Sequence, residues 1–156
     1  MAFSPSSPVT GAAMTGLTSP TYTLTLDTPP NATTAKQYAV TQLGGTQTGV
    51  TVHSISSPFT ATMFRPPAYK TLGVPDSNGL FKQFPVNRHE ILIRKGCSVA
   101  ANQPVQVNMA RLILSQSAGV DVYDQANFKA MLSLLFGLLW SAGSSIADTT
   151  FTGNLN

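Results

Sequence analysis

Basic residues gather in the middle of this 156-residue chain, and their side chains are of the kind that binds polyanions. Between residues 65 and 111 the sequence has seven basic side chains against two acidic ones, a net charge of +5, whereas the rest of the chain carries −2. The seven are Arg65, Lys70, Lys82, Arg88, Arg94, Lys95 and Arg111. Lysine and arginine attract polyanions by neutralising phosphates and releasing counterions. Ordinary solvated side chains are the alternative interpretation, so the charge pattern needs support from elsewhere.

Catalytic and metal-binding patterns are a second kind of chemistry, and the sequence offers few residues for them. His53 and His89 stand on separate expected strands, without the close spacing of metal ligands. Cys97 and a histidine have the residue types of a nucleophile and its base, but no local signature surrounds this cysteine. The sequence therefore predicts no catalytic residue, no metal site and no cofactor. It leaves Cys97 as a structural residue or, as the minor alternative, as a partner in an intermolecular disulfide.

Composition favours a single associating domain over residues 1–156. Charged residues make up 10% of the chain against about 25% in a typical domain, so little of the surface is charged. The single cysteine excludes an internal disulfide. The first 20 residues have neither the basic start nor the apolar segment of a signal peptide, and we therefore expect synthesis in the cytoplasm.

The elements that position these side chains are mostly strands. Residues 1–20 are rich in Ser, Thr, Pro and Gly and are expected to form an extended N-terminal arm. Residues 21–116 form the β-rich region, in which "LGGT" (43–46) is interpreted as a turn and 66–85 as a loop. The alternating pattern predicts strands over residues 21–26, 36–42, 49–56, 59–65, 88–96 and 105–116. The last two are separated by a short turn sequence and are expected to pair as a long hairpin.

A helical region over residues 121–148, followed by a tail over 149–156, closes the chain. Asp121 or Asp124 is expected to cap the helix or to lie in its first turn. The stretch "ANFKAMLSLLFGLLW" (126–140) is too short to span a membrane, which takes about 20 apolar residues. Its apolar side chains cover an arc too wide for packing on one sheet. We therefore predict that a second copy of the chain covers part of this helix, through Phe128, Met131, Leu132, Leu135, Leu138, Leu139 and Trp140.

The order of these elements, with "VNMARLILSQ" (107–116) and "DQANFKAMLSLLFGLL" (124–139), resembles the coat proteins of the single-stranded RNA bacteriophages. The resemblance implies an α+β fold with an N-terminal β-hairpin, a five-stranded antiparallel sheet and C-terminal helices that pack on the sheet of a dimer partner. It also implies assembly of the dimers into an icosahedral virion in the cytoplasm of a bacterial host. The inner sheet face would bind single-stranded genomic RNA, including an operator hairpin that gives translational repression, and no membrane is implied as a partner.

The resemblance also implies positions for the RNA contacts. The polar pair of the family's last strand falls at Gln106 and Asn108, although the usual aromatic residue two places before the Asn is replaced by Gln106 itself. Basic and hydroxyl side chains of the preceding strands complete the expected set, which is Arg94, Arg88, Lys95, Thr60, Thr62 and Arg65.

Two other classes of protein stay open at this point. A non-viral shell or pilus-type subunit would also be β-rich and self-assembling, and its basic residues would have no role in RNA binding. A small enzyme or ligand-binding domain is the third class, which the lack of a catalytic pattern in the sequence disfavours.

Overall fold

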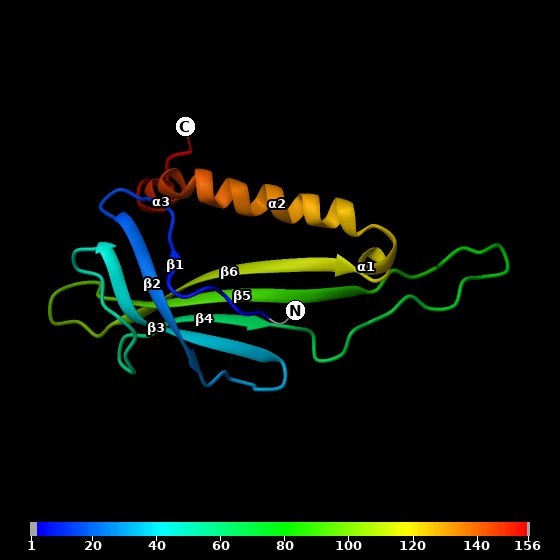
Figure 1. Cartoon of the computed structure of the whole chain (residues 1–156), viewed down its shortest axis with the longest axis horizontal. Coiled ribbons are helices and arrows are strands. Elements are labelled where there is room, and N and C mark those ends of the chain that lie inside the picture. The colour runs from blue at the N-terminus through cyan, green and yellow to red at the C-terminus, as the bar shows by residue number, and fades with distance from the viewer. Residues whose placement is uncertain (1–2, 156) are drawn as a thin grey trace.

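The computed structural model describes residues 3–155 as a curled antiparallel sheet with a layer of helices beside it (Figure 1). The strands follow one another across the sheet in chain order. They are β1 (Val9–Thr10), β2 (Thr18–Asp27), β3 (Ala35–Thr46), β4 (Phe59–Phe64), β5 (Val86–Cys97) and β6 (Gln106–Ser117). The helices are α1 (Val120–Tyr123), α2 (Gln125–Ser141) and α3 (Gly143–Thr152).

The α+β class is confirmed, but the expected number of strands is wrong. The resemblance implied an N-terminal hairpin beside a five-stranded sheet, whereas one sheet of six strands is observed. The difference arises in the N-terminal segment, where Val9 pairs with Tyr22 and Thr10 with Thr21, so that β1 extends the sheet. We use the name N-terminal arm for residues 3–17, which include β1.

Two further interpretations of the first half of the chain are wrong. Residues 49–56 form a loop, held by the His53 amide, which donates to the Val40 carbonyl oxygen at 2.8 Å. The expected "LGGT" turn lies inside β3, where Gly44 pairs with Thr21 of β2. Gly45 has a φ of 73°, and an added Cβ there would collide with the carbonyl oxygen of Ser19. The glycines therefore allow a close strand approach at a register shift, as in a β-bulge.

The long hairpin is confirmed, and its register assigns side chains to the two faces of the sheet. Arg94 of β5 pairs with Met109 of β6, and Lys95 pairs with Asn108. Directly paired residues point to the same side of an antiparallel sheet, and successive residues alternate. Arg94 and Met109 therefore share one face, and Lys95 and Asn108 share the other.

The N-terminal arm identifies these faces. The ring of Phe3 meets the ring of Tyr38 edge to face, with centroids 5.9 Å apart. Val9 lines an apolar cavity with side chains on the Tyr38 side of the sheet, among them Leu24, Val40 and Ile93. We call this side the covered face, and the opposite side, which carries Arg94, the open face.

The helices begin where the acidic residues predict. The carboxylate of Asp124 accepts a hydrogen bond from the Asn127 amide at 3.3 Å and caps α2, while Asp121 lies in the first turn of α1. The helical part of the chain extends beyond the expected end at residue 148, since α3 runs to Thr152. It packs on the N-terminal arm, where the hydroxyls of Thr15 and Ser144 lie 3.2 Å apart.

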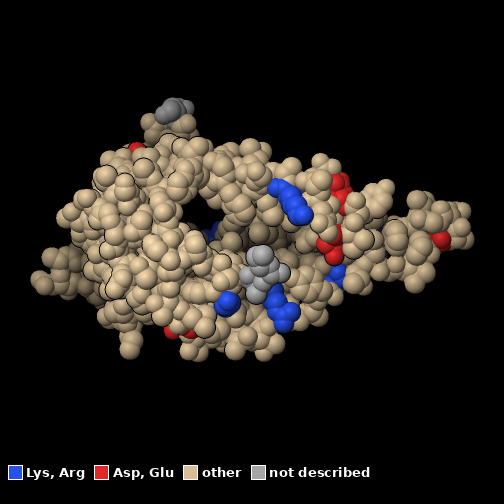
Figure 2. Space-filling model, viewed as in Figure 1, with Lys and Arg blue, Asp and Glu red and all other residues tan. Residues whose placement is uncertain are grey.

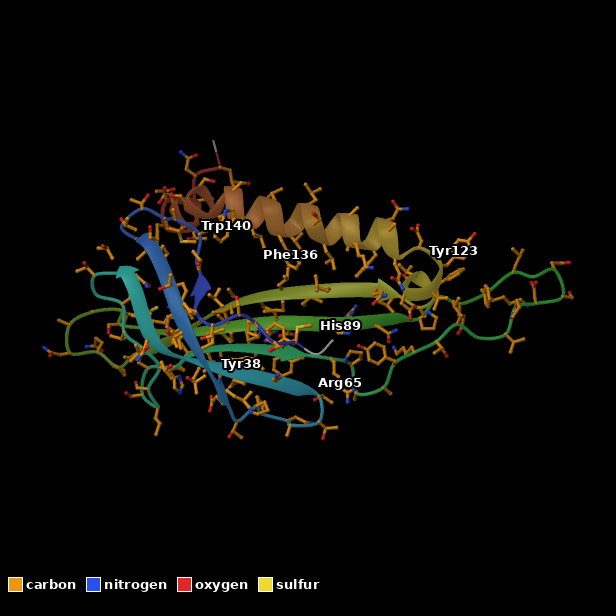
Figure 3. The ribbon with its side chains drawn as sticks, in the orientation of Figure 1. Tyr38, Arg65, His89, Tyr123, Phe136 and Trp140 are labelled. Atoms are coloured by element: carbon orange, nitrogen blue, oxygen red, sulfur yellow. The ribbon has the colours of Figure 1, made fainter. Side chains whose placement is uncertain are left out.

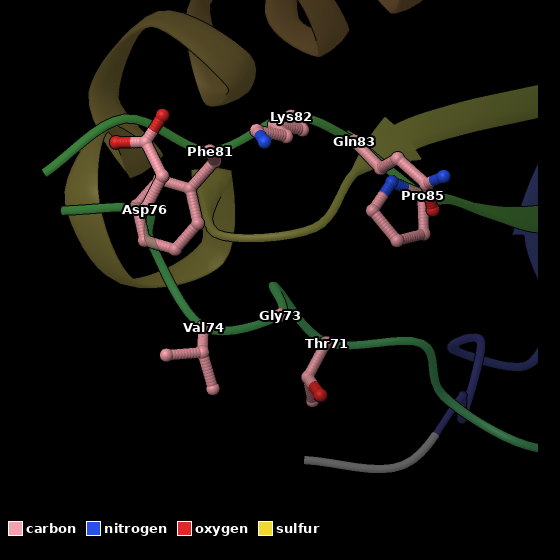
Figure 4. Close-up of a pocket in the computed structure, with 8 residues that line it drawn as sticks. All are labelled: Thr71, Gly73, Val74, Asp76, Phe81, Lys82, Gln83 and Pro85. Carbon is pink, nitrogen blue, oxygen red and sulfur yellow. The ribbon is translucent and has the colours of Figure 1, made fainter. Parts of the chain in front are cut away.

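The loop between β4 and β5 projects from one end of the sheet (Figure 1). Its tip is ordered by Asp76, whose carboxylate accepts hydrogen bonds from the amides of Asn78 and Leu80 at 2.9 and 3.0 Å. Its base is anchored by Asn87, whose side chain exchanges two hydrogen bonds with the backbone of Lys70. Between its limbs lies a cavity lined by Val74, Asp76 and Phe81, among others, shown in Figure 4.

Candidate functional site

Helix α2 is the first candidate surface, because it has no buried residue among those that the structure describes. Figure 1 shows α2 running alongside β6, the edge strand, rather than across its own sheet. Phe128, Leu132 and Leu135 are half-buried, while the other expected interface residues are exposed: Met131, Leu138, Leu139 and Trp140. A soluble helix with this composition requires a covering layer. The single chain does not supply it.

Space for such a layer lies next to the helix. Figure 2 shows a hollow between the helical layer and the rest of the chain. Phe136 points from α2 toward the sheet across this space (Figure 3) and keeps 48% of its surface exposed. About 100° further around the helix, a Cβ added to Gly137 would meet nothing within 4 Å. Both sides of α2 are therefore accessible to another molecule.

The edge of the sheet next to α2 is equally uncovered. Strand β6 is 12 residues long and is paired along one side only, with β5. Its open-face side chains include Val107, Met109 and Ile113, and Met109 keeps 62% of its surface exposed. Long apolar edge strands pair readily with another chain. The edge of β6 and the exposed sides of α2 are therefore two apolar surfaces that the single chain leaves uncovered.

The open face holds the second candidate site, a polar cluster around Arg94. The guanidinium of Arg94 donates from Nε to the hydroxyl of Thr60 at 3.2 Å, and from Nη2 to the Oε1 atom of Gln37 at 3.4 Å. The hydroxyl of Thr62 donates to the same Oε1 at 2.8 Å. The Gln37 amide nitrogen in turn donates to Oδ2 of Asp27 at 2.6 Å. Four neighbouring strands, β2 to β5, contribute to this cluster.

The middle of the cluster is more buried than its two ends, Asp27 and Arg94. Thr60 and Thr62 are 1% exposed and Gln37 is 5% exposed, so the middle of the cluster is closed to solvent. The hydrogen bond from Gln37 holds the pKa of Asp27 below its usual value, because it favours the charged carboxylate. Arg94 remains partly exposed and has guanidinium donors beyond the two that these hydrogen bonds use.

Other charged residues extend the open face. Arg88 lies on the same face of β5 and is exposed. Arg111 of β6 is paired with Glu90, with Nε and Oε1 2.8 Å apart. The open face thus carries three arginines and two carboxylates, counting Asp27, and a partly exposed Arg94 near its middle.

The structure does not bring all the expected RNA-contact residues together. Arg94, Arg88, Thr60 and Thr62 share the open face, but Gln106, Asn108 and Lys95 lie on the covered face. The Lys95 ammonium is bound to the backbone and hydroxyl oxygens of Thr51 at 2.9 and 2.8 Å. Arg65 lies beyond the end of β4 and donates to the Thr33 carbonyl oxygen. The eight expected residues are therefore divided between the two faces of the sheet and the end of β4, and their contact with RNA stays a prediction.

Sequence reasoning missed Gln37, Asp27 and Arg111 as members of this face. Gln37 lies 57 residues from Arg94 in the chain, and only the strand order brings the two together. The register of two strand pairs, β3–β4 and β4–β5, would have been needed to find it. Arg111 was the better signal, because it is an arginine with apolar residues on both sides in the strand sequence.

The residues considered for catalysis have structural partners. Nδ1 of His53 accepts a hydrogen bond from the Phe59 amide at 3.0 Å, and Nε2 of His89 lies 2.6 Å from the Tyr69 hydroxyl. Cys97 is a free, half-buried thiol. Within residues 3–155 no group of three or more His, Cys, Asp or Glu side chains could hold a metal ion.

No single helix among the described residues is long and apolar enough to cross a bilayer. Helices α2 and α3 together reach the required length and composition, but the chain bends by 66° between them.

Comparison with solved structures gives a close match over the whole chain. The chain is 55% identical to the protein of the "Virus-like particle of bacteriophage ESE020", with a TM-score of 0.94, and the match covers 99% of this chain and 100% of that one. A more distant match, the "Virus-like particle of Wenzhou levi-like virus 4", has 17% identity and a TM-score of 0.44, covering 88% and 68% of the two chains. No protein-family model and no curated protein matches the chain.

Proposed function

Because this chain belongs to the coat proteins of the single-stranded RNA bacteriophages, we propose that it is the structural subunit of a virion shell. Copies of the chain assemble, in the cytoplasm of the bacterial host, into a closed icosahedral shell around the genomic RNA. The role is structural rather than catalytic. The 55% identity over the full length to a protein of a phage virus-like particle supports this assignment.

The first step of assembly is a homodimer. The observation that carries this proposal is that α2 has no buried residue in the single chain, although it is largely apolar. A two-fold axis beside β6 places the edge strands of two copies next to each other. The unpaired backbone groups of both edges then find partners in one self-complementary contact. The α2 helix of each copy then covers the partner's sheet. Gln106 and Asn108, on the covered face, fall within this contact.

The RNA lies against the open face of the dimer sheet. In this arrangement the covered face is occupied by the arms and helices, so only the open face is free to meet a polyanion. Arg94 and Arg88 supply positive charge there, and phosphate neutralisation with counterion release drives the binding. Recognition of one genomic hairpin, with translational repression, would add contacts to bases, which specify sequence where phosphate contacts do not.

Expression of the chain in bacteria tests the assembly. We expect closed particles of uniform size that contain RNA. Leu139→Asp places a charge in the proposed dimer contact and should prevent particle formation, whereas Ala130→Asp, at an exposed residue on the opposite side of α2, serves as the matched control. A soluble monomer from the unchanged chain would contradict the shell, and empty particles would contradict only the RNA binding.

A pair of substitutions tests the face that binds RNA. Arg94→Ala should weaken binding of a labelled RNA hairpin to the unassembled protein. It should also make the negative slope of log K against log salt shallower by about 0.7 to 0.9, which corresponds to the loss of one phosphate contact. Asn108→Ala on the covered face should leave the slope unchanged. The reverse pattern would show that the RNA lies on the other face.

A further inference from the structure

We propose that Gln37 is a positioning residue that fixes the guanidinium of Arg94 on the open face for a phosphodiester of single-stranded RNA. This inference rests on the proposed function, because it concerns the way the same face holds its ligand. It assigns Thr60 and Thr62 a supporting role in place of the direct RNA contact that the family resemblance implied.

The side-chain amide of Gln37 uses all of its hydrogen-bonding capacity. Its nitrogen donates to Oδ2 of Asp27 at 2.6 Å and to the Thr28 carbonyl oxygen at 3.2 Å. Its oxygen accepts from the Thr62 hydroxyl at 2.8 Å and from Nη2 of Arg94 at 3.4 Å. A flipped amide would turn its oxygen toward the Asp27 carboxylate and the Thr28 carbonyl oxygen and its N–H groups toward the guanidinium, so only the contact with the Thr62 hydroxyl could form again, in the reverse direction. The amide therefore has one orientation.

This orientation matters because Gln37 separates a negative charge from a positive one. A carboxylate paired directly with a guanidinium forms a strong bidentate pair and cancels the charge that an RNA phosphate needs. The amide binds Asp27 on one side and Arg94 on the other, so it holds the guanidinium in place without supplying a negative charge. Arg94 therefore keeps its charge and its remaining donors for an anion.

The burial of the cluster makes this arrangement rigid. A buried polar group that loses its partner costs free energy, so neither Gln37 nor Thr62 has a favourable alternative position. The hydroxyl proton of Thr62 is committed to Gln37, and the hydroxyl oxygen of Thr60 accepts from Nε of Arg94. Both threonines are 1% exposed, so an RNA base cannot reach their hydroxyls while the cluster is intact.

A double-mutant cycle tests the inference on the full-length protein, released from particles and kept unassembled, with a fluorescein-labelled RNA hairpin as the probe. Gln37→Leu removes the amide at similar volume, and Thr60→Val removes the second acceptor of Arg94. Each is measured with Arg94 present and in the Arg94→Ala background. Gln42→Leu, at an exposed glutamine of the same strand, is the matched control.

We expect Gln37→Leu and Thr60→Val each to weaken RNA binding about threefold or more when Arg94 is present, and to have no further effect in the Arg94→Ala background. The negative slope of log K against log salt should also become shallower, because a displaced guanidinium neutralises the phosphate less well. A loss of folded protein would lower the bound fraction without changing this slope. If Gln37→Leu fails to fold, Thr60→Val decides by the same criteria.

The failures of the two proposals are distinguishable. Equal losses in both backgrounds, with Arg94→Ala itself harmful, would overturn the positioning role of Gln37 and leave the RNA-binding face in place. No effect of Arg94→Ala on binding or on the salt slope would overturn the face itself, and the inference with it.

Discussion

Trp140 gives the most quantitative test of the covered helix. It is the only tryptophan of the chain and lies near the end of α2, with 59% of its surface exposed in the single chain. If a second copy covers α2, the indole becomes buried between the two chains. Trp140→Ala then removes apolar contact from the dimer and little from the fold of each chain.

The size of the effect follows from the exposed area. A tryptophan side chain presents up to about 250 Å², so 59% exposure leaves about 150 Å² for a partner to cover. At about 25 cal/mol per Å², complete covering is worth about 4 kcal/mol per chain. A two-fold dimer contains this contact twice, so the substitution should lower its free energy of dissociation to folded monomers by up to about 8 kcal/mol. An exposed residue with no partner would change stability by about 0.5 kcal/mol or less.

Urea unfolding of the unassembled protein, followed by far-UV circular dichroism at two protein concentrations, measures this difference. Unfolding of the unchanged protein should depend on concentration, as for any dimer that unfolds to single chains. Trp140→Ala should lower the midpoint strongly, whereas Ile55→Ala, at a fully exposed loop residue, should not. A midpoint for Trp140→Ala within error of the unchanged protein would refute the reasoning.

Further predictions concern the sheet. Gly45→Ala should destabilise the fold by about 1 to 3 kcal/mol or more, because φ is positive and the backbone of Ser19 leaves no room for a Cβ; thermal unfolding measures this, with Gly73→Ala, in open space, as the control. The lowered pKa of Asp27 means that its contribution to stability is present above its unfolded pKa and is lost as the pH falls through the folded value. The free energy of unfolding should therefore change less with pH in the acid range in Asp27→Asn than in the unchanged protein. The same pH dependence in both would contradict the hydrogen bond from Gln37. Met109→Pro removes an N–H from the unpaired side of β6 and should block pairing of this edge with a second copy, and normal particles from this variant would show that the edge is not used.

The sequence was most informative where one strong pattern covered a long segment. The β5–β6 hairpin and helix α2 were predicted with boundaries close to those observed, because alternation and a helical apolar repeat each extend over ten or more residues. The cap at Asp124 was also predicted, since its role depends only on local geometry.

The strand and turn predictions that were wrong failed because contacts between distant parts of the chain decide the structure there. Residues 49–56 alternate like a strand, but His53 bonds to Val40 and Phe59 and holds the segment as a loop. The glycines at 44 and 45 were interpreted as a turn because their role in the close approach to β2 depends on a distant register. The separation of Arg94 from Asn108 onto opposite faces likewise follows from the pairing of β5 with β6.

The mass of the folded, unassembled protein at high dilution, measured by sedimentation, tests the central claim most directly. Our account predicts a species of twice the chain mass of 16.4 kDa at the lowest concentration at which the protein stays folded. A stable, fully folded species of 16.4 kDa would contradict it, because α2 would then persist without a second copy to cover it.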